Sequence, residues 1–225
     1  MKARLASLIL LLLLAAKLNA GIINGDFSIA GVSPDPFANW TTDVSFFEPP
    51  SGTGFAQFDT DDVNFQSIHL AQTFSLDAGS TTLSFEFKIT FAIPTGGVPD
   101  SFQVTLFDNS ITPVELFPEN PPTFTSFYRI DNDGVSEFFD SNFVMSDFDA
   151  LSGVRTITLN ISTLTPQILT LDFLLNGSVD GQSTQVQLDN VMILSSPTVV
   201  PEPTSLLVWS ACIGLCIFSR SYRRG

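Results

Sequence analysis

The feature that most constrains this sequence is an apolar residue at every second position, repeated along most of its length. In Thr82–Ile93 six apolar residues alternate with polar or small ones. A period of two places one set of side chains on one face of a β-strand, and no segment between residues 21 and 196 keeps a helical period instead. The alternation recurs at Ile68, Leu70, Phe74 and Leu76 (Gln72 being the exception), at Phe102, Val104 and Leu106, at Ile157, Leu159 and Ile161, at Leu169, Leu171, Phe173 and Leu175, and at Val186 and Leu188. Many short strands with one apolar face predict an all-β fold in which two antiparallel sheets form a sandwich.

The last alternating segment changes phase. Its apolar residues fall on even positions up to Leu188 and on odd positions from Val191. One extra residue at Asp189-Asn190 would produce this shift as a β-bulge, which re-aims side chains. We therefore expect Asp189 to be something other than a routine solvent-facing residue.

The stretch Pro113–Asp149 is less regular than the rest and contains four prolines and an aromatic run. We expect long loops and short edge strands in this region. Because loops carry a large share of binding residues, we also expect any binding surface to lie here.

The two ends of the chain differ from the middle. Met1–Ala20 begins with basic residues, continues with a short apolar run and ends in a small residue, which is the pattern of a secretory signal peptide. A retained membrane anchor is the alternative, although Lys17 shortens the apolar run. We predict a signal peptide at 1–20, a sandwich at 21–196 and a separate C-terminal segment at 197–225.

The sandwich region is strongly acidic. Residues 21–200 contain 3 basic and 22 acidic side chains, a net charge of −19. Such a field repels phosphate backbones and argues against nucleic-acid binding, whereas it leaves carboxylates for hard cations such as calcium. The only cysteines are Cys212 and Cys216, so the sandwich has no disulfide and must rely on its apolar core.

Two short motifs indicate the kind of sandwich. Asn24-Gly25-Asp26-Phe27, with Trp40-Thr41 further on, resembles the opening of carbohydrate-binding-module-like jelly rolls, and Leu188-Asp189-Asn190-Val191 resembles their closing strand. The resemblance covers about residues 22–194 and implies a jelly-roll fold whose first and last strands lie close together. It also implies a structural calcium ion held there by acidic side chains, for which Asp26 and Asp189 are the candidates.

Sequence patterns for catalysis are scarce. The single histidine, His69, falls on the polar face of its strand, and nucleophile-elbow, zinc-protease and phosphate-loop motifs are absent from the sequence. We therefore expect no enzyme. A glycosidase or lyase that uses two carboxylates is the alternative that the composition leaves open.

Two further ligand classes have candidate residues. The oxygen-rich runs Asp59–Asp62 and Asp131–Gly134 suit calcium, although such residues also form turns without an ion. Sugar rings stack on aromatic side chains, and Trp40 and Tyr128 are the only tryptophan and tyrosine in the sandwich region. We name both as candidate ligand-binding residues, with a core role as the alternative for Trp40, and we assign the phenylalanines to the core.

The C-terminal segment combines three features in a fixed order. The triplet Pro201, Glu202 and Pro203 precedes the apolar run Thr204–Phe218, and the basic residues Arg220, Arg223 and Arg224 follow it. A helix of this length covers only ~22 Å of a hydrocarbon layer of ~30 Å, and the arginines would remain in the cytoplasm.

This segment resembles the PEP-CTERM sorting signal. The resemblance implies a Gram-negative-type bacterium that makes extracellular polysaccharide, in which a membrane-embedded exosortase processes the protein. An ordinary membrane anchor is the alternative. We therefore predict an exported, non-enzymatic protein of the cell envelope or of an exopolysaccharide or biofilm matrix, held in the inner membrane only before processing. The alternative functions are a carbohydrate-binding module and a carboxylate-dependent glycosidase or lyase.

Overall fold

A computed structural model describes residues 21–29, 37–42, 54–60, 66–90, 100–119, 125–131, 136–177 and 183–195. The predicted signal peptide and sorting segment lie outside these residues. The chain divides into one unit up to Leu194 and a second from Ser195, and the fold described below belongs to the first. Within the described part of the chain, no helix is long and apolar enough to cross a membrane.

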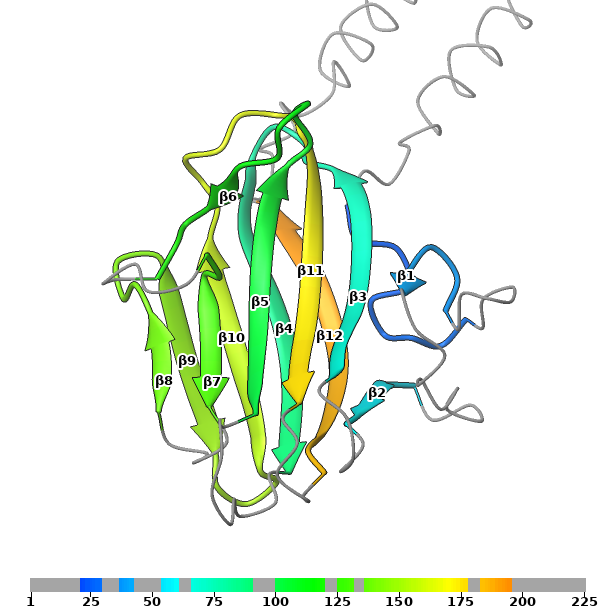
Figure 1. Cartoon of the computed structure of the whole chain (residues 1–225). Helices are drawn as coiled ribbons and strands as arrows, with labels where there is room; N and C mark the ends of the chain where they lie inside the picture. Colours follow the sequence, from blue (N-terminus) through cyan, green and yellow to red (C-terminus); the bar gives the residue numbers. More distant parts are fainter. Residues whose placement is uncertain are drawn as a thin grey trace, which may run out of the picture. The chain divides into compact units, whose positions relative to one another are not determined.

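The described residues form strands that pair in two sheets. The strands are β1 (Thr41–Thr42), β2 (Ala56–Asp59), β3 (Gln66–Ser75), β4 (Ser80–Thr90), β5 (Ser101–Asp108), β6 (Glu115–Leu116), β7 (Tyr128–Asp131), β8 (Glu137–Phe139), β9 (Val144–Asp149), β10 (Val154–Asn160), β11 (Ile168–Gly177) and β12 (Gln185–Ser195). A seven-stranded sheet has the order β1-β3-β11-β5-β7-β8, with β6 beside β5. A five-stranded sheet has the order β2-β12-β4-β10-β9 and lies behind the first in Figure 1.

The two sheets are joined by aromatic rings. Phe85 of β4 meets Phe173 of β11 edge to face with ring centroids 5.2 Å apart, and Phe87 of β4 lies 4.9 Å from Phe102 of β5. All four rings are buried, and such ring pairs add to the stabilisation that their buried area gives. The described strand pairings are antiparallel, so the predicted all-β sandwich of two antiparallel sheets is confirmed.

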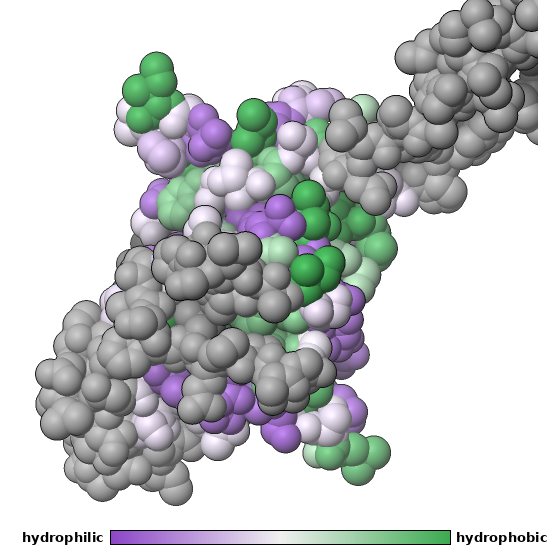
Figure 2. Space-filling view, turned by 90° about the vertical axis from the view of Figure 1, so that its right-hand side faces the viewer, coloured by the Kyte–Doolittle hydropathy of each residue, from purple (hydrophilic) through white to green (hydrophobic). Residues whose placement is uncertain are grey.

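The alternation predicts the core well. The predicted apolar sets in β3, β4, β5, β10, β11 and β12 point inward and are buried wherever the structure describes them, apart from the half-buried Ile89 and Ile193. Figure 2 shows the side of the molecule that faces right in Figure 1, where hydrophilic and hydrophobic residues are interspersed on the described surface. The apolar side chains that define the strands are therefore enclosed between the sheets.

Gln72 breaks the apolar face of β3 and is nevertheless buried. Its amide oxygen accepts the Ile23 N–H at 2.8 Å, and its amide nitrogen donates to the carbonyls of Ile23 at 2.8 Å and of Asn39 at 3.0 Å. Buried backbone groups need such partners. The polar exception in the strand is therefore the point at which the N-terminal segment is held.

The opening motif forms a compact turn. The Asn24 carbonyl accepts the Phe27 N–H at 3.1 Å and the Trp40 indole N–H at 3.1 Å. Phe27 has a φ of 50°, which is uncommon for a bulky residue, and its ring packs against Phe37 and Trp40. Gly25 lies so close to β12 that an added Cβ would be 1.8 Å from the Val191 carbonyl oxygen. The first and last segments of the fold are therefore adjacent.

The phase change in β12 has a local cause. Asn190 adopts a φ of 53°, and burial shifts from Leu188 to Val191 across it. A residue in the left-handed region together with a shift of the buried face is the geometry of a bulge. The Val191 N–H donates to the Gly25 carbonyl at 2.9 Å, so the shifted part of the strand receives the N-terminal turn.

Candidate functional site

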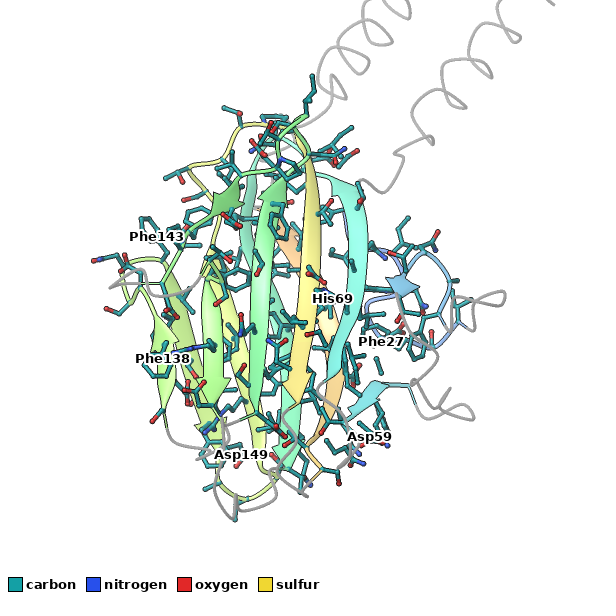
Figure 3. All side chains as sticks on the ribbon, viewed as in Figure 1. Phe27, Asp59, His69, Phe138, Phe143 and Asp149 are labelled. Atoms are coloured by element: carbon teal, nitrogen blue, oxygen red, sulfur yellow. The ribbon has the colours of Figure 1, made fainter. Side chains whose placement is uncertain are left out.

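The outer face of the seven-stranded sheet carries a hollow of about 440 Å³. It is lined by Thr41, Thr42, His69, Ala71, Phe107, Thr170 and Asp172. These residues come from β1, β3, β5 and β11, and Figure 3 places His69 over the middle of that sheet. A volume of roughly 300–1,000 Å³ is typical of small-molecule sites. The hollow is therefore large enough to be a binding site.

Strand register brings the lining residues together. Asp172 of β11 lies opposite Ala71 of β3, and Thr170 of β11 lies opposite Phe107 of β5. Their neighbours Leu169, Leu171 and Phe173 point into the core, so alternation turns Thr170 and Asp172 outward. The hollow is a consequence of the pairing of four strands, β1, β3, β5 and β11, most of which are far apart in sequence.

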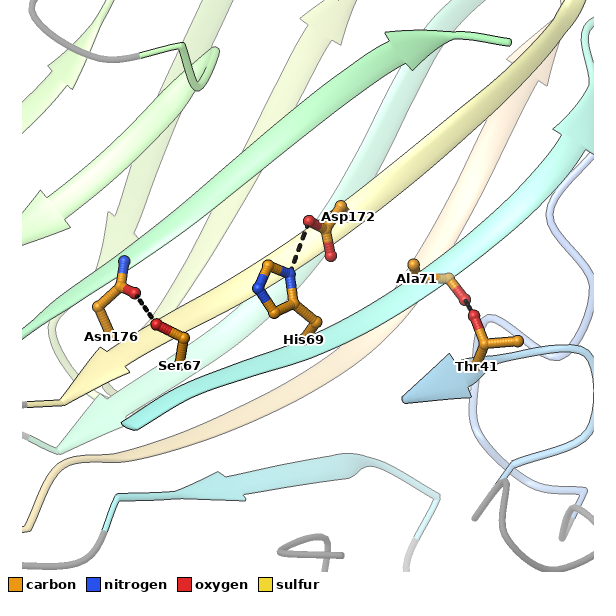
Figure 4. A network of polar contacts seen from close by, with 6 residues as sticks. All are labelled: Thr41, Ser67, His69, Ala71, Asp172 and Asn176. Carbon is orange, nitrogen blue, oxygen red and sulfur yellow. Dashed lines mark hydrogen bonds and ion pairs between the residues drawn. The ribbon is translucent and has the colours of Figure 1, made fainter. Parts of the chain in front are cut away.

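His69 and Asp172 form a close pair in this hollow. His69 Nδ1 lies 2.9 Å from Asp172 Oδ2, and the two side chains are 36% and 14% exposed (Figure 4). The other oxygen of the carboxylate, Asp172 Oδ1, has no hydrogen-bond donor among the described residues and is buried. A buried acceptor without a donor is costly. This oxygen is therefore an unsatisfied acceptor that the protein covers, and a ligand would reach it only if the lining moved.

Hydrogen bonds across the strands fix the same face. Thr73 and Thr170 hydroxyls are 2.9 Å apart, the Ser67 hydroxyl donates to Asn176 Oδ1 at 2.7 Å, and the Thr41 hydroxyl donates to the Ala71 carbonyl at 3.2 Å (Figure 4 shows the last two). Cross-strand polar pairs of this kind stabilise a sheet face. The face is therefore ordered and rich in hydroxyl groups.

The chemistry of the hollow is that of a polar surface with one aromatic ring. Hydroxyls, an imidazole and a carboxylate can exchange hydrogen bonds with a ligand, and the half-buried Phe107 offers an apolar ring beside them. Asp172 is the one carboxylate among the described lining residues. Hydrolysis of a glycosidic bond by a pair of carboxylates needs a second one about 5 to 9.5 Å away.

The structure places the two predicted aromatic ligand residues in the core. Trp40 is 1% exposed and packs against Phe27 and Phe173. Tyr128 is 0% exposed, and its hydroxyl donates to Glu137 Oε2 at 3.1 Å. Burial, with the Glu137 charge adding to it, raises the pKa of the Tyr128 phenol above its ordinary value. Trp40 therefore has the core role that was the alternative for it, and neither Trp40 nor Tyr128 exposes a ring face to a ligand.

The predicted calcium residues are brought near each other. Burial, followed by the charges of Glu86 and Asp26, raises the pKa of Asp189, although the Asn190 N–H opposes this shift. Asp26 Oδ1 accepts the Ser28 hydroxyl at 2.9 Å, and Asp189 Oδ1 accepts the Asn190 N–H at 2.6 Å.

These contacts bear on whether calcium would fit. The described residues contain no cluster of three or more His, Cys, Asp or Glu that could hold a metal. Calcium takes about six to eight oxygen ligands, so carbonyls and water would have to complete a site between Asp26 and Asp189. Calcium at this position stays a prediction.

The other predicted acidic runs are only partly described. Asp59 accepts hydrogen bonds from the amides of Gln57 and Gln185, each at 2.9 Å, and Asp131 Oδ1 lies 3.6 Å from Arg129 Nε. Thr60 is also described and is buried, with its hydroxyl accepting the Thr184 N–H at 2.8 Å, whereas Asp61, Asp62 and residues 132–134 lie outside the described part of the chain. The two aspartates that are described already have protein partners.

The region Pro113–Asp149 forms short strands, as predicted, but none of its described residues lines the hollow. Its described part contains a polar network, in which Glu137 Oε2 accepts the Ser146 hydroxyl and Glu137 Oε1 lies 3.4 Å from Arg155 Nη2. Arg155 also lies over the Phe148 ring at 4.3 Å. Arg155 therefore links β10 to β8 and β9 through Glu137 and Phe148, and the polar and aromatic residues of this region have structural partners.

The sequence prediction did not single out Phe107 or Asp172. Phe107 carries one detectable signal, because it is an aromatic residue in the polar phase of β5, whose apolar phase is Phe102, Val104 and Leu106. Asp172 carries no signal of its own, since an acidic residue in the polar phase of a strand is ordinary.

Comparisons with known proteins give distant similarities only. No protein-family model and no curated protein matches the sequence. The solved structures that resemble the fold include TmCBM61 in complex with β-1,4-galactotriose (13% identity, 80% of this chain, 97% of that chain, TM-score 0.40), CBM4 (15%, 78%, 99%, 0.39) and the Emp47p carbohydrate recognition domain (11%, 81%, 100%, 0.39). At these values the similarity decides neither a ligand nor an activity for this chain.

Proposed function

We propose that this protein is an exported, non-catalytic glycan-binding protein whose jelly-roll body holds polysaccharide in the hollow around His69, Phe107 and Asp172. One observation carries the proposal: the half-buried, outward-facing ring of Phe107 shares one hollow with hydroxyl groups, an imidazole and a carboxylate. Sugar rings present C–H faces to aromatic rings and hydroxyl donors to carboxylates. A pyranose unit stacked on Phe107 would therefore have the polar side chains of the lining beside it as hydrogen-bonding partners.

The single carboxylate of the described lining supports binding without hydrolysis. A galactan is one of the neutral polysaccharides that the test should include.

The test is binding of the purified protein to a panel of immobilised polysaccharides, repeated with Phe107→Ala. A stacked ring contributes roughly 1 to 1.5 kcal/mol, so we expect about tenfold weaker binding by the variant. Phe143→Ala is the matched control, since Phe143 is an exposed aromatic residue near β9, away from the hollow (Figure 3). Equal loss in both variants, or no polysaccharide bound by the unaltered protein, would contradict the proposal.

We further propose that the protein reaches the cell envelope or an extracellular polysaccharide matrix through the PEP-CTERM route. The order of Pro201-Glu202-Pro203, a short apolar run and three arginines supports this proposal. Replacing the triplet with Ala-Ala-Ala in the native bacterium should leave the unprocessed chain in the inner membrane. Normal processing of that variant, or normal processing in a strain without exosortase, would contradict it.

A further inference from the structure

We infer that the glycan held in this hollow is an uncharged polysaccharide and that polymers bearing uronate or sulfate groups are excluded from it. This inference rests on the proposed function and specifies its ligand class. It follows from where the few positive charges of the sandwich lie.

Residues 21–200 contain three cations, Lys88, Arg129 and Arg155. Both arginines are 7% exposed and lie among carboxylates. Arg129 Nε lies 3.8 Å from Glu119 and 3.6 Å from Asp131, and Arg155 Nη2 lies 3.4 Å from Glu137.

Aromatic rings cover the same two arginines. Arg129 lies over the Phe138 ring at 4.1 Å, and Arg155 lies over the Phe148 ring at 4.3 Å. The positive charge of both residues is therefore compensated within the fold and is not presented to an anionic ligand. This use of arginine is general, since its planar guanidinium suits buried pairs and aromatic stacking.

Lys88 is the remaining cation and is exposed, but it lies on β4 of the other sheet. The hollow lies on the outer face of the seven-stranded sheet, and when His69 is neutral its described lining contains one formal charge, that of Asp172. When His69 is protonated, the His69–Asp172 pair is neutral as a unit. Neither state of the pair offers a net positive charge to a carboxylate or sulfate group.

The surroundings add to this local charge. The net charge of residues 21–200 is −19, and the one exposed cation in that range, Lys88, lies on the other sheet. A polyanionic chain would be repelled at a distance by this field and again at close range by Asp172. A neutral polysaccharide incurs neither repulsion, and its hydroxyls supply the donors that the hollow accepts.

The experiment compares chemical forms of one polymer. A neutral polysaccharide bound by the protein is oxidised at C6 to its uronate form, and part of that product is methyl-esterified to remove the charge again. At an ionic strength of about 0.1 M the Debye length is about 10 Å, so the uronate groups and the acidic protein still repel each other at that range. We therefore expect the uronate form to bind at least roughly tenfold more weakly than the neutral form. The methyl ester should recover most of the lost affinity, which separates charge from the loss of the C6 hydroxyl.

Salt and a variant complete the test. At about 1 M salt the Debye length falls to about 3 Å, so the difference between uronate and neutral forms should shrink while binding of the neutral form changes little. Asp172→Asn should also reduce the difference in affinity between the uronate and neutral forms. Chitosan is a polycation and should be attracted by the net negative charge of the whole sandwich, so its binding should weaken with salt and should not change in Phe107→Ala.

The outcomes distinguish the two proposals. If the uronate form binds as well as the neutral form or better, and Phe107→Ala abolishes that binding, the glycan site stands and the inference of an uncharged ligand is wrong. The inference is also wrong if the difference survives both esterification and high salt. If no form of any polysaccharide binds, the proposed function itself fails.

Discussion

Replacing Gln72 by Met tests whether the polar exception in β3 holds the N-terminal segment. The two side chains are similar in size, so the substitution removes hydrogen bonds with little change in packing volume. Three backbone groups lose their partner: the Ile23 N–H, the Ile23 carbonyl and the Asn39 carbonyl. Simple apolar patterning predicts the opposite result, since Met would complete the apolar face of the strand.

The magnitude follows from these three bonds. Each of the three lost bonds costs about 1 to 1.5 kcal/mol, and exchanging a buried amide for a thioether returns about 1 kcal/mol. We therefore expect the free energy of unfolding to fall by about 2–4 kcal/mol. For a domain of this size that corresponds to a Tm lower by roughly 4–16 °C.

The assay is urea and thermal unfolding of Gln72→Met beside Gln187→Met. Gln187 lies on the outer face of β12, and its amide donates only to side-chain oxygens of Gln57 and Gln185. The control should therefore change stability by less than about 1 kcal/mol. Hydrogen exchange at the Ile23 amide should also accelerate in Gln72→Met alone. A Gln72→Met protein as stable as the original, with a protected Ile23 amide, would refute the reasoning.

Three further predictions concern other parts of the sandwich. Gly25→Ala should lower the free energy of unfolding, measured by urea titration, by about 2–4 kcal/mol, because the added Cβ would clash with the Val191 carbonyl. Gly79→Ala is the control and should cost clearly less, since Gly79 has a positive φ but open space around it. Thr184→Val should cost about 1–3 kcal/mol in the same assay, because the buried carboxylate of Asp100 loses the Thr184 hydroxyl donor. The pKa of Asp189 is raised in the folded state, so ionisation of this carboxyl opposes folding. Its contribution to the free energy of unfolding therefore falls as the pH rises above the pKa that the carboxyl has in the unfolded chain. Asp189→Asn should therefore raise the Tm at neutral pH in chelator, and if calcium binds there, added calcium should raise the Tm of the original protein and not of the variant.

The sequence predicts the strands and the core because both depend on local alternation. Residues such as Phe85, Phe87 and Phe173 need only their phase to be assigned to the inner face, and the structure buries all three. The bulge at Asn190 is predictable for the same reason, since a change of phase within one strand is visible in the sequence.

The hollow is not predictable in this way because it depends on register between distant strands. Asp172 lies opposite Ala71 and Thr105, which are 101 and 67 positions away in sequence. Single-sequence patterns show which face of a strand a residue occupies, but they do not show which residues of other strands share that face with it. Trp40 and Tyr128 were predicted to bind a ligand and are buried instead. Residue type alone does not distinguish an aromatic ring on the surface from one between the sheets.

Gln72 and Phe107 both break the alternation of polar and apolar residues, Gln72 as a polar residue on an apolar face and Phe107 as an aromatic residue on a polar face. The free-energy cost of each exception indicates its role. A polar side chain in an apolar phase, as at Gln72, has to be compensated by hydrogen bonds inside the fold, and the N-terminal backbone supplies them. An aromatic ring in a polar phase, as at Phe107, is only half-buried and lies outside the core, so it gains little from folding. Its remaining apolar surface can be removed from water only by something that covers the hollow. The first kind of exception therefore marks where the chain holds itself together, and the second marks where we propose that it holds a sugar.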